Sequence, residues 1–167
     1  LIIFYFSLFS FCNADNLNTL FEKLFDAKNL QQAEKLEDQI WNSWTRHPKN
    51  DYLTNKLENG TYSMHHQQYR MALKLFTDVI NEDPKWAEGW NKRATLLFIL
   101  GDYEKSLDDI EKVLDLEPRH FGALSGRAQI YLSLKEYEKA VNDLRKAKSI
   151  YPLIKSGENI KLSLIHI

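Results

Sequence analysis

Histidines are the side chains of this chain best suited to bind a metal or transfer protons. They are His47, His65, His66, His120 and His166. His65 and His66 are neighbours, so on a helix their imidazoles point about 100° apart and cannot share a metal ion well. The chain has no H-E-x-x-H motif. We therefore expect no metal site.

Acidic and nucleophilic side chains give no catalytic pattern either. Asp108 and Asp109 are adjacent, and on a helix they diverge too far for paired acid–base work. No serine follows the G-x-S-x-G motif, and no P-loop is present. The sequence predicts a non-catalytic protein without a cofactor.

Composition describes an ordinary globular chain. It has 167 residues, a formal net charge of −1 and 27% charged residues. A length of this kind suits one domain with its own core, and a nearly neutral chain argues against a nucleic-acid partner held by bulk charge. With only six glycines and four prolines, long helices joined by short turns are favoured over sheets.

The first eleven residues, LIIFYFSLFSF, are apolar and uncharged, and CNAD follows them. This pattern predicts a signal peptide over residues 1–14, incomplete at its start and cleaved after Ala14. The run is too short to span a bilayer. We expect an exported protein, periplasmic in a Gram-negative bacterium, without a membrane span in the mature chain. The alternatives are a membrane anchor through this segment, or a buried strand or helix.

An internal period of 34 residues runs through the chain. It separates Pro84, Pro118 and Pro152. The same step relates Tyr69, Tyr103 and Tyr137; Ala72, Ser106 and Ala140; Leu73, Leu107 and Val141; Phe76, Ile110 and Leu144; Val79, Val113 and Ala147; and Gly60, Ala94 and Ala128. So many positions in phase indicate a repeated structural unit.

Each unit has the pattern of two helices and a turn. The first helix carries a small residue, such as Ala94, where a neighbouring helix must come close. Gly101 fits the position after a helix that needs positive φ. Tyr103 then starts a second helix, which Pro118 ends because proline cannot continue it.

These motifs resemble the tetratricopeptide repeat, a unit of 34 residues with small, aromatic and apolar positions in this order and a closing proline. The resemblance covers residues 53–152 as three repeats, 53–86, 87–120 and 121–152. It implies an all-α solenoid of helix–turn–helix repeats, wound as a right-handed superhelix. The opening helix of the first repeat is unusual, since Lys56, Asn59 and Ser63 replace large apolar residues, and it is either loosely packed or a polar end.

The flanking segments are interpreted as caps and additions. Residues 15–50 have helical periodicity and predict a helix pair stacked on the first repeat as an N-terminal cap. Residues 153–161 predict the start of a C-terminal capping helix. Residues 162–167 look like the translation of a sequencing adaptor, so we exclude them from the fold.

Two pairs of charged residues recur with the period. Arg93 and Arg127 occupy the same repeat position, and Asp109 and Asp143 each follow sixteen residues later. We predict salt bridges between the two helices of a repeat, Arg93 with Asp109 and Arg127 with Asp143, with separations below about 4 Å.

The resemblance also implies a concave groove lined by the first helices. The residues at its positions that we expect to contact a partner are Leu57, Thr61, Met64, Asn91, Thr95, Phe98, Ser125, Gln129 and Leu132. Domains of this family that hold chaperone tails use Lys and Asn in a carboxylate clamp, but Leu57 and Thr61 stand at the first two clamp positions. An uncharged groove with apolar side chains instead suits an extended or helical peptide with apolar anchors.

Two further features have both a structural and a functional interpretation. Arg119 and His120 lie at the junction of two repeats, as an anion or carboxylate contact or as a solvated turn. The four tryptophans, Trp41, Trp44, Trp86 and Trp90, could stack on a ligand, but packing is favoured because Trp90 holds the usual tryptophan position of the repeat.

We therefore expect a scaffold that binds a peptide or protein in the concave groove. One alternative is a structural or assembly subunit of an envelope complex. The other is a ligand-binding or enzyme accessory domain with its site at Arg119 and His120. The sequence specifies neither the partner nor the oligomeric state.

Overall fold

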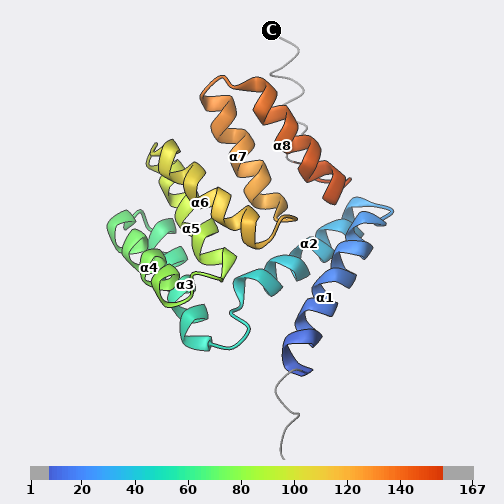
Figure 1. The fold of residues 1–167 in the computed structure, drawn as a ribbon, viewed down its shortest axis with the longest axis horizontal. Coiled ribbons are helices and arrows are strands. Elements are labelled where there is room, and N and C mark those ends of the chain that lie inside the picture. The colour runs from blue at the N-terminus through green and yellow to red at the C-terminus, as the bar shows by residue number, and fades with distance from the viewer. Residues whose placement is uncertain (1–7, 156–167) are drawn as a thin grey trace, which may run out of the picture.

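The computed structural model describes residues 8–155, with side chains from residue 16 onward, and its regular elements are α-helices without strands over that range. Figure 1 shows their arrangement. The helices are α1 (Leu8–Phe25), α2 (Leu30–Thr45), α3 (Asp51–His65), α4 (Tyr69–Glu82), α5 (Ala87–Ile99), α6 (Tyr103–Leu116), α7 (Phe121–Ser133) and α8 (Tyr137–Ile150).

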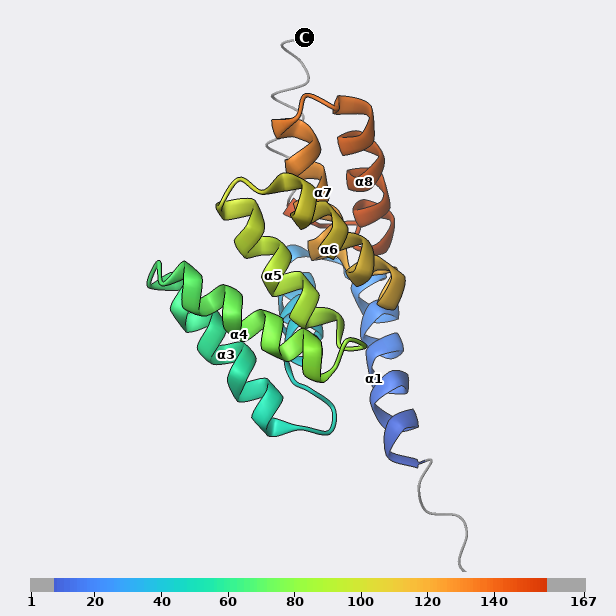
Figure 2. The same ribbon diagram turned by 60° about the vertical axis from the view of Figure 1, so that its left-hand side comes forward.

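Helices α3 to α8 form three antiparallel pairs, α3 with α4, α5 with α6, and α7 with α8, stacked side by side (Figures 1 and 2). Each second helix begins at the tyrosine of the 34-residue period. Each also ends two residues before the proline of its unit, because proline lacks the N–H and clashes with the preceding turn. The predicted all-α repeat solenoid is confirmed.

The turn within each pair has the same hydrogen bonds three times. In the second unit, the N–H of Asp102 donates to the carbonyl of Leu97, and the N–H of Gly101 donates to that of Phe98. This is a Schellman motif, which satisfies carbonyls that a helix end would leave unpaired. Gly101 has φ 78°, as predicted, and its counterparts Gln67 and Lys135 have φ 58° and 61°.

The small residue of each first helix allows the two helices of a pair to approach closely. A Cβ on Gly60 would lie 2.5 Å from the Phe76 ring, so no larger residue fits without a shift. In the next unit the Ser106 hydroxyl donates to the carbonyl of Ala94 at 2.8 Å. These contacts hold the core of each pair together.

The N-terminal helix pair is present, but the expectation that it stacks on the first repeat is wrong. Buried side chains of α1 and α2 share one core cluster with Phe121 and Leu124 of α7 and with Ala147 and Tyr151 of the third pair. Figure 1 shows α2 running beside the N-terminal ends of α5 and α7. The pair, which we call the hairpin (residues 8–45), therefore folds back along the repeats.

The polar surface of α3 explains this position. Tyr52, Glu58, Asn59 and Tyr62 are exposed, and Lys56 pairs with Glu82 of α4. A helix with such a face can end the stack in water without a cap, as terminal repeats of solenoids do. Only the last residues of the hairpin reach the first repeat, where Trp86 Nε1 donates to the carbonyl of Trp44 at 2.9 Å.

The ends of the chain bear on three predictions. Within the part of the chain described here, no helix has both the length and the apolar character needed to cross a membrane. Helix α1 includes residues 8–14 of the predicted signal peptide, and residues 1–7 lie outside the described range. Leu153 and Ile154 pack against the core cluster of the hairpin and Lys155 pairs with Glu34 of α2, while residues 156–161 of the predicted capping helix and residues 162–167 lie outside the described range.

Candidate functional site

The two predicted salt bridges between the helices of a repeat are confirmed. Arg93 donates from Nε and Nη2 to the two carboxylate oxygens of Asp109, both at 2.8 Å. Arg127 holds Asp143 in the same way, at 2.7 and 2.8 Å. Both aspartates are buried, and the bidentate geometry is the strongest that an arginine and a carboxylate make. These pairs connect the two helices of the second and third repeat units. Since each arginine already bonds both oxygens of its aspartate, the pairs are structural rather than ligand-binding groups.

The nine predicted groove residues differ in what they offer to a partner. Leu57 is buried in the core of the first unit, and the Asn91 amide donates to the Glu88 carboxylate at 3.1 Å. Ser125 is half-buried where α2 meets α7. Thr95 and Gln129 are exposed. The other four predicted residues, Thr61, Met64, Phe98 and Leu132, are half-buried.

Helix α2 covers the N-terminal part of this face. The Trp41 ring lies so close to Gly122 that a Cβ there would be 2.6 Å from the ring. The ammonium of Lys92, on α5, lies 6.0 Å from the centre of the same ring. A cavity between α2 and α7 lies beside Ser125, Trp41 and Tyr151. The chain itself therefore occupies one end of the predicted groove.

A buried polar pair lies beneath the hairpin. His120 Nδ1 accepts the N–H of Ala123 at 3.0 Å, so Nε2 carries the proton and donates to Glu88 at 3.3 Å. Both side chains are fully buried, and the Trp44 ring stacks on His120 at 4.0 Å. Burial alone raises the pKa of the Glu88 carboxyl, but the His120 hydrogen bond and the Lys92 charge more than offset it, so this pKa lies below its ordinary value.

Arg119, the other residue of the predicted junction site, is held within the chain. Its guanidinium donates to Glu117 at 2.9 Å and to Asn18 of α1 at 2.8 Å. It also lies over the Phe21 ring, 4.2 Å from the centre. Arg119 and His120 thus both contact the hairpin, and the Arg119 guanidinium already pairs with a carboxylate of its own chain.

His47, His66 and the tryptophans have structural contacts, and His166 lies outside the described residues. His47 bonds Asp83 at 2.8 Å, and His66 contacts the Tyr62 carbonyl at 2.9 Å. In residues 16–155 no group of three or more His, Cys, Asp or Glu side chains is arranged to hold a metal ion. Trp44 and Trp86 are buried, as the packing interpretation expects, whereas Trp41 and Trp90 are only partly buried.

The open part of the face lies between α5 and α7, beyond the hairpin. A cavity of about 110 Å³ opens there. Its apolar lining comes from Ala94, Phe98, Ile110, Ala123 and Ile130, and its other lining residues are Asn91, Thr95, Ser106, Gly122, Gly126 and Gln129. No charged side chain lines it. Four of the nine predicted residues, Asn91, Thr95, Phe98 and Gln129, thus meet at one cavity.

Comparison with known proteins identifies the repeated unit. Family models of the tetratricopeptide repeat match residues 87–120 and 122–152. A TPR repeat-containing protein of Rhizobium etli is 31% identical over 101 residues, which make up 60% of this chain and 49% of that protein. The chain contains tetratricopeptide repeats. It spans about half the length of this curated relative.

Solved structures share the fold of this tetratricopeptide repeat protein. The Arabidopsis OM64 TPR domain matches with a TM-score of 0.66 at 22% identity, over 70% of this chain and 98% of that domain. The first TPR of Spaghetti (RPAP3), bound to an HSP90 peptide, matches with a TM-score of 0.65 at 19% identity, over 70% of this chain and 92% of that domain. The TPR2B domain of yeast Sti1, in complex with an Hsp70 peptide, matches with a TM-score of 0.60 at 21% identity, over 68% of this chain and 90% of that domain.

Sequence reasoning missed the hairpin's place on the groove face and the role of two glycines. Gly122 and Gly126 are four residues apart on α7, so they lie on the same side of that helix. One contacts Trp41, and the other lines the open cavity. Gly126, in the interior of α7 and one turn after Gly122, was the signal that the sequence offered, since glycine is unfavourable in a helix interior without a packing or functional reason.

Proposed function

We propose that this tetratricopeptide repeat protein is a non-catalytic scaffold that binds a peptide or protein segment on the open part of its groove face. The observation that carries this proposal is the cavity between α5 and α7, where an apolar lining is surrounded by exposed Thr95 and Gln129. Binding sites combine apolar walls with a few polar groups in this way.

The fold relatives support the same class of function. Two of the solved domains with this architecture hold peptides of HSP90 and Hsp70. Their identity to this chain is low, so the chemistry of the partner must come from this chain's own residues. Leu57, at one position of the chaperone-tail clamp, is buried in a core rather than exposed to a ligand. We propose a partner that is recognised by apolar anchors instead of a terminal carboxylate.

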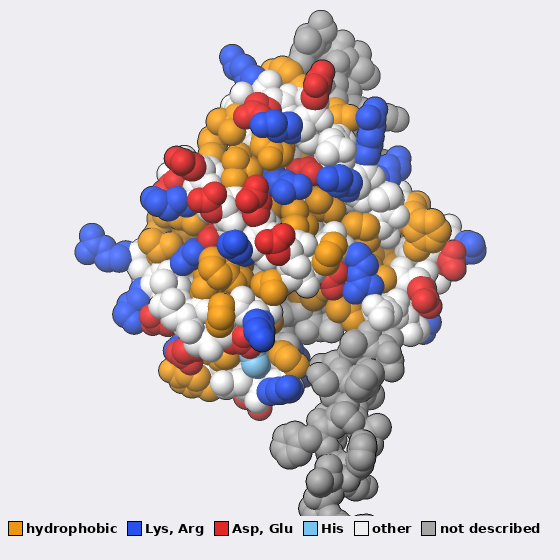
Figure 3. Space-filling model, viewed as in Figure 1, with side chains coloured by type: hydrophobic (Ala, Val, Ile, Leu, Met, Phe, Trp, Pro, Cys, Tyr) orange, Lys and Arg blue, Asp and Glu red, His pale blue; other side chains and the backbone are white. Residues whose placement is uncertain are grey.

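Surface charge is consistent with this choice. Figure 3 shows acidic, basic and apolar side chains interspersed on the face it displays, without a large area of one sign. Long-range attraction of a highly charged partner needs such an area. On this face, contact chemistry rather than long-range charge is therefore expected to select the partner.

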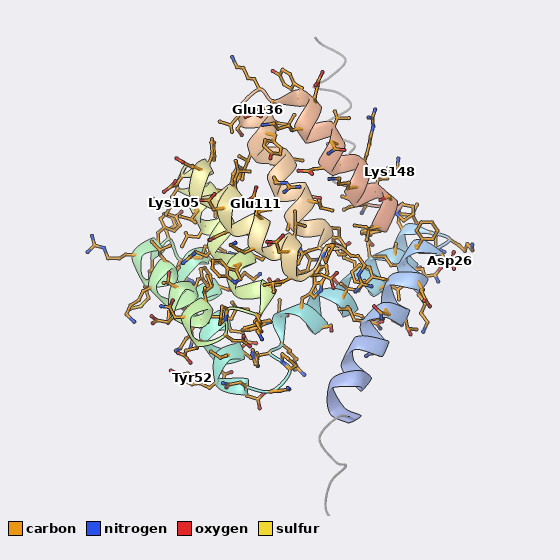
Figure 4. The ribbon with its side chains drawn as sticks, in the orientation of Figure 1. Asp26, Tyr52, Lys105, Glu111, Glu136 and Lys148 are labelled. Atoms are coloured by element: carbon orange, nitrogen blue, oxygen red, sulfur yellow. The ribbon has the colours of Figure 1, made fainter. Side chains whose placement is uncertain are left out.

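Affinity capture with matched variants tests the proposal. The bait is the full chain, and the groove variant carries Phe98→Ala with Gln129→Ala. The control carries Tyr52→Ala on α3 with Lys148→Ala on α8, both exposed residues that Figure 4 labels on other helices. We expect that the bait and the control variant retain a partner that the groove variant loses. Calorimetry with the purified partner then measures its affinity for each variant.

Equal affinity of the groove variant and the bait for that partner would contradict the proposal. Binding would then use another surface, such as the hairpin or the second helices. Circular dichroism of each variant shows whether the fold is retained, so a loss of binding is interpreted only for folded protein.

A further inference from the structure

Five glycines lie in the described residues, and the fold accounts for four of them. A Cβ on Gly60, Gly89 or Gly122 would lie within 3.0 Å of a packed side chain, and Gly101 has positive φ. Gly126 is different, because no atom lies within 4 Å of the place of its Cβ and its φ is not positive. Nothing within the described chain requires glycine at this position.

This glycine is unfavourable for the helix that contains it. Gly126 lies in the interior of α7, where glycine loses more backbone freedom on folding than alanine does and weakens the helix. A glycine that the fold does not use is typical of a place where a ligand comes close to the backbone. The open side of Gly126 forms part of the cavity between α5 and α7.

The cavity has the size and chemistry of a site for one aliphatic side chain. Its volume is about 110 Å³, and an engineered apolar cavity of about 150 Å³ accepts benzene. Its apolar walls are Ala94, Phe98, Ile110, Ala123 and Ile130. The absence of a charged lining residue disfavours a charged anchor, because a buried charge without a partner is costly.

The surroundings of the cavity limit the rest of the partner. Thr95 and Gln129 are exposed at its edge and can hydrogen-bond a peptide backbone. On the other side, Trp41 of α2 contacts Gly122 one helical turn before Gly126. A peptide at this site therefore meets the hairpin as a wall and extends away from it.

We infer that the cavity beside Gly126 binds a single aliphatic side chain of an uncharged peptide segment, whose backbone lies directly against α7. This inference rests on the proposed function and adds the chemistry of the partner and the place of its anchor. An added Cβ at residue 126 points into the space that the peptide occupies.

The test selects a displayed library of random peptides on the full chain and measures the affinity of the selected peptides for variants. Gly126→Ala adds one methyl group, and Gly126→Phe fills the cavity. We expect selected peptides to share an uncharged stretch around Leu, Ile, Val or Met. The dissociation constant is expected to rise at least tenfold in Gly126→Ala, and binding is expected to be lost in Gly126→Phe.

Thermal unfolding separates this role from a structural one. Gly126→Ala is expected to raise the midpoint of unfolding while it weakens binding, since alanine favours the helix and meets no atom of the chain. Gly122→Ala is the matched contrast, because its methyl group meets Trp41 and is expected to lower the midpoint.

Unchanged affinity of Gly126→Ala for the selected peptides overturns the inference. If those peptides are then weakened by Met64→Ala or Leu132→Ala, the groove remains the site and only the anchor's place is wrong. If the wild-type chain selects no peptide, or peptides that no groove variant weakens, the proposed function falls as well.

Discussion

Individual buried charges in this protein are satisfied by partners on the same helix or on a neighbouring one. Asp143 is 2% exposed and is held by both nitrogens of an Arg127 fork, and Glu88 is surrounded by His120, Lys92 and Asn91. A charge taken out of water needs such partners, because its lost hydration is not otherwise replaced. Each buried carboxylate therefore depends on its partner side chains for the stability of the fold.

Removing one member of the Arg127–Asp143 pair is expected to lower the free energy of unfolding more than replacing both members does. Arg127→Asn leaves a buried carboxylate unpaired, which costs about 3 kcal/mol of unfolding free energy. The double variant Arg127→Asn with Asp143→Leu copies the first repeat, where Asn59 and Leu75 stand, and is expected to recover most of that loss. Urea unfolding of the single and double variants measures both. A double variant less stable than Arg127→Asn would contradict this account.

Glu88 predicts a pH dependence of stability. Its pKa in the folded protein is below the ordinary value of 4.5, so the unfolded chain binds a proton at higher pH than the folded chain does. The stabilisation from Glu88 is thus present above 4.5 and is lost as the pH falls through the folded pKa. Denaturation across this range should show the stability difference between wild type and Glu88→Gln shrinking as the pH falls. A difference independent of pH would show that the carboxylate is not stabilised by folding.

At the scale of the helix, the turns inside the repeats have one geometry but different residues. Gln67, Gly101 and Lys135 all have positive φ at the same repeat position. Glycine accepts this conformation freely, whereas a side chain clashes with the carbonyl beyond it, at about 1–2 kcal/mol per residue. The first and third turns are therefore strained where the second is not.

Glycine in the strained turns is expected to stabilise the protein. Lys135→Gly removes the clash, and the larger entropy of glycine in the unfolded chain takes back part of the gain, leaving about 0.5–1 kcal/mol. Gly101→Ala is the reverse change and is expected to destabilise by a similar amount. Thermal unfolding of the two variants should shift the midpoint in opposite directions. A lower midpoint for Lys135→Gly would mean that its side chain makes a contact that outweighs the strain.

For the whole molecule, the hairpin joins the two ends of the repeat array. Near Trp44 it contacts the first unit, where His47 bonds Asp83. Further along, the Tyr151 hydroxyl donates to Glu37 at 3.1 Å, which ties α2 to the third unit. A linear repeat array has contacts only between neighbours, so the hairpin adds the long-range contacts that such an array lacks.

The hairpin should therefore unfold together with the repeats. We expect amides in α2 and α7 to exchange with solvent with the same free energy of opening in native-state hydrogen exchange, because they share one core. Trp44→Ala should lower that free energy in both helices, by about 3 kcal/mol for a buried aromatic side chain. Faster exchange in α2 alone would show that the hairpin opens independently of the repeats.

Much of this architecture is encoded locally and was predicted from the sequence. The period of 34 residues, the tyrosine that starts each second helix and the proline that follows it determine where helices begin and end, since these depend on neighbours in the chain. The two Arg–Asp pairs were also predicted, because a repeated unit brings the same two positions together each time.

Only the tertiary structure decided how the hairpin is placed and which groove residues remain open. Amphipathic stripes show that α1 and α2 bury one side each, but not against which surface, because an apolar stripe fits any complementary apolar face. The polar face of α3 and the small Gly122 made the surface beside α7 the one where Trp41 fits. In this position the hairpin places the Trp44 ring on buried His120 and lies beside Ser125, while the cavity beside Gly126 stays open.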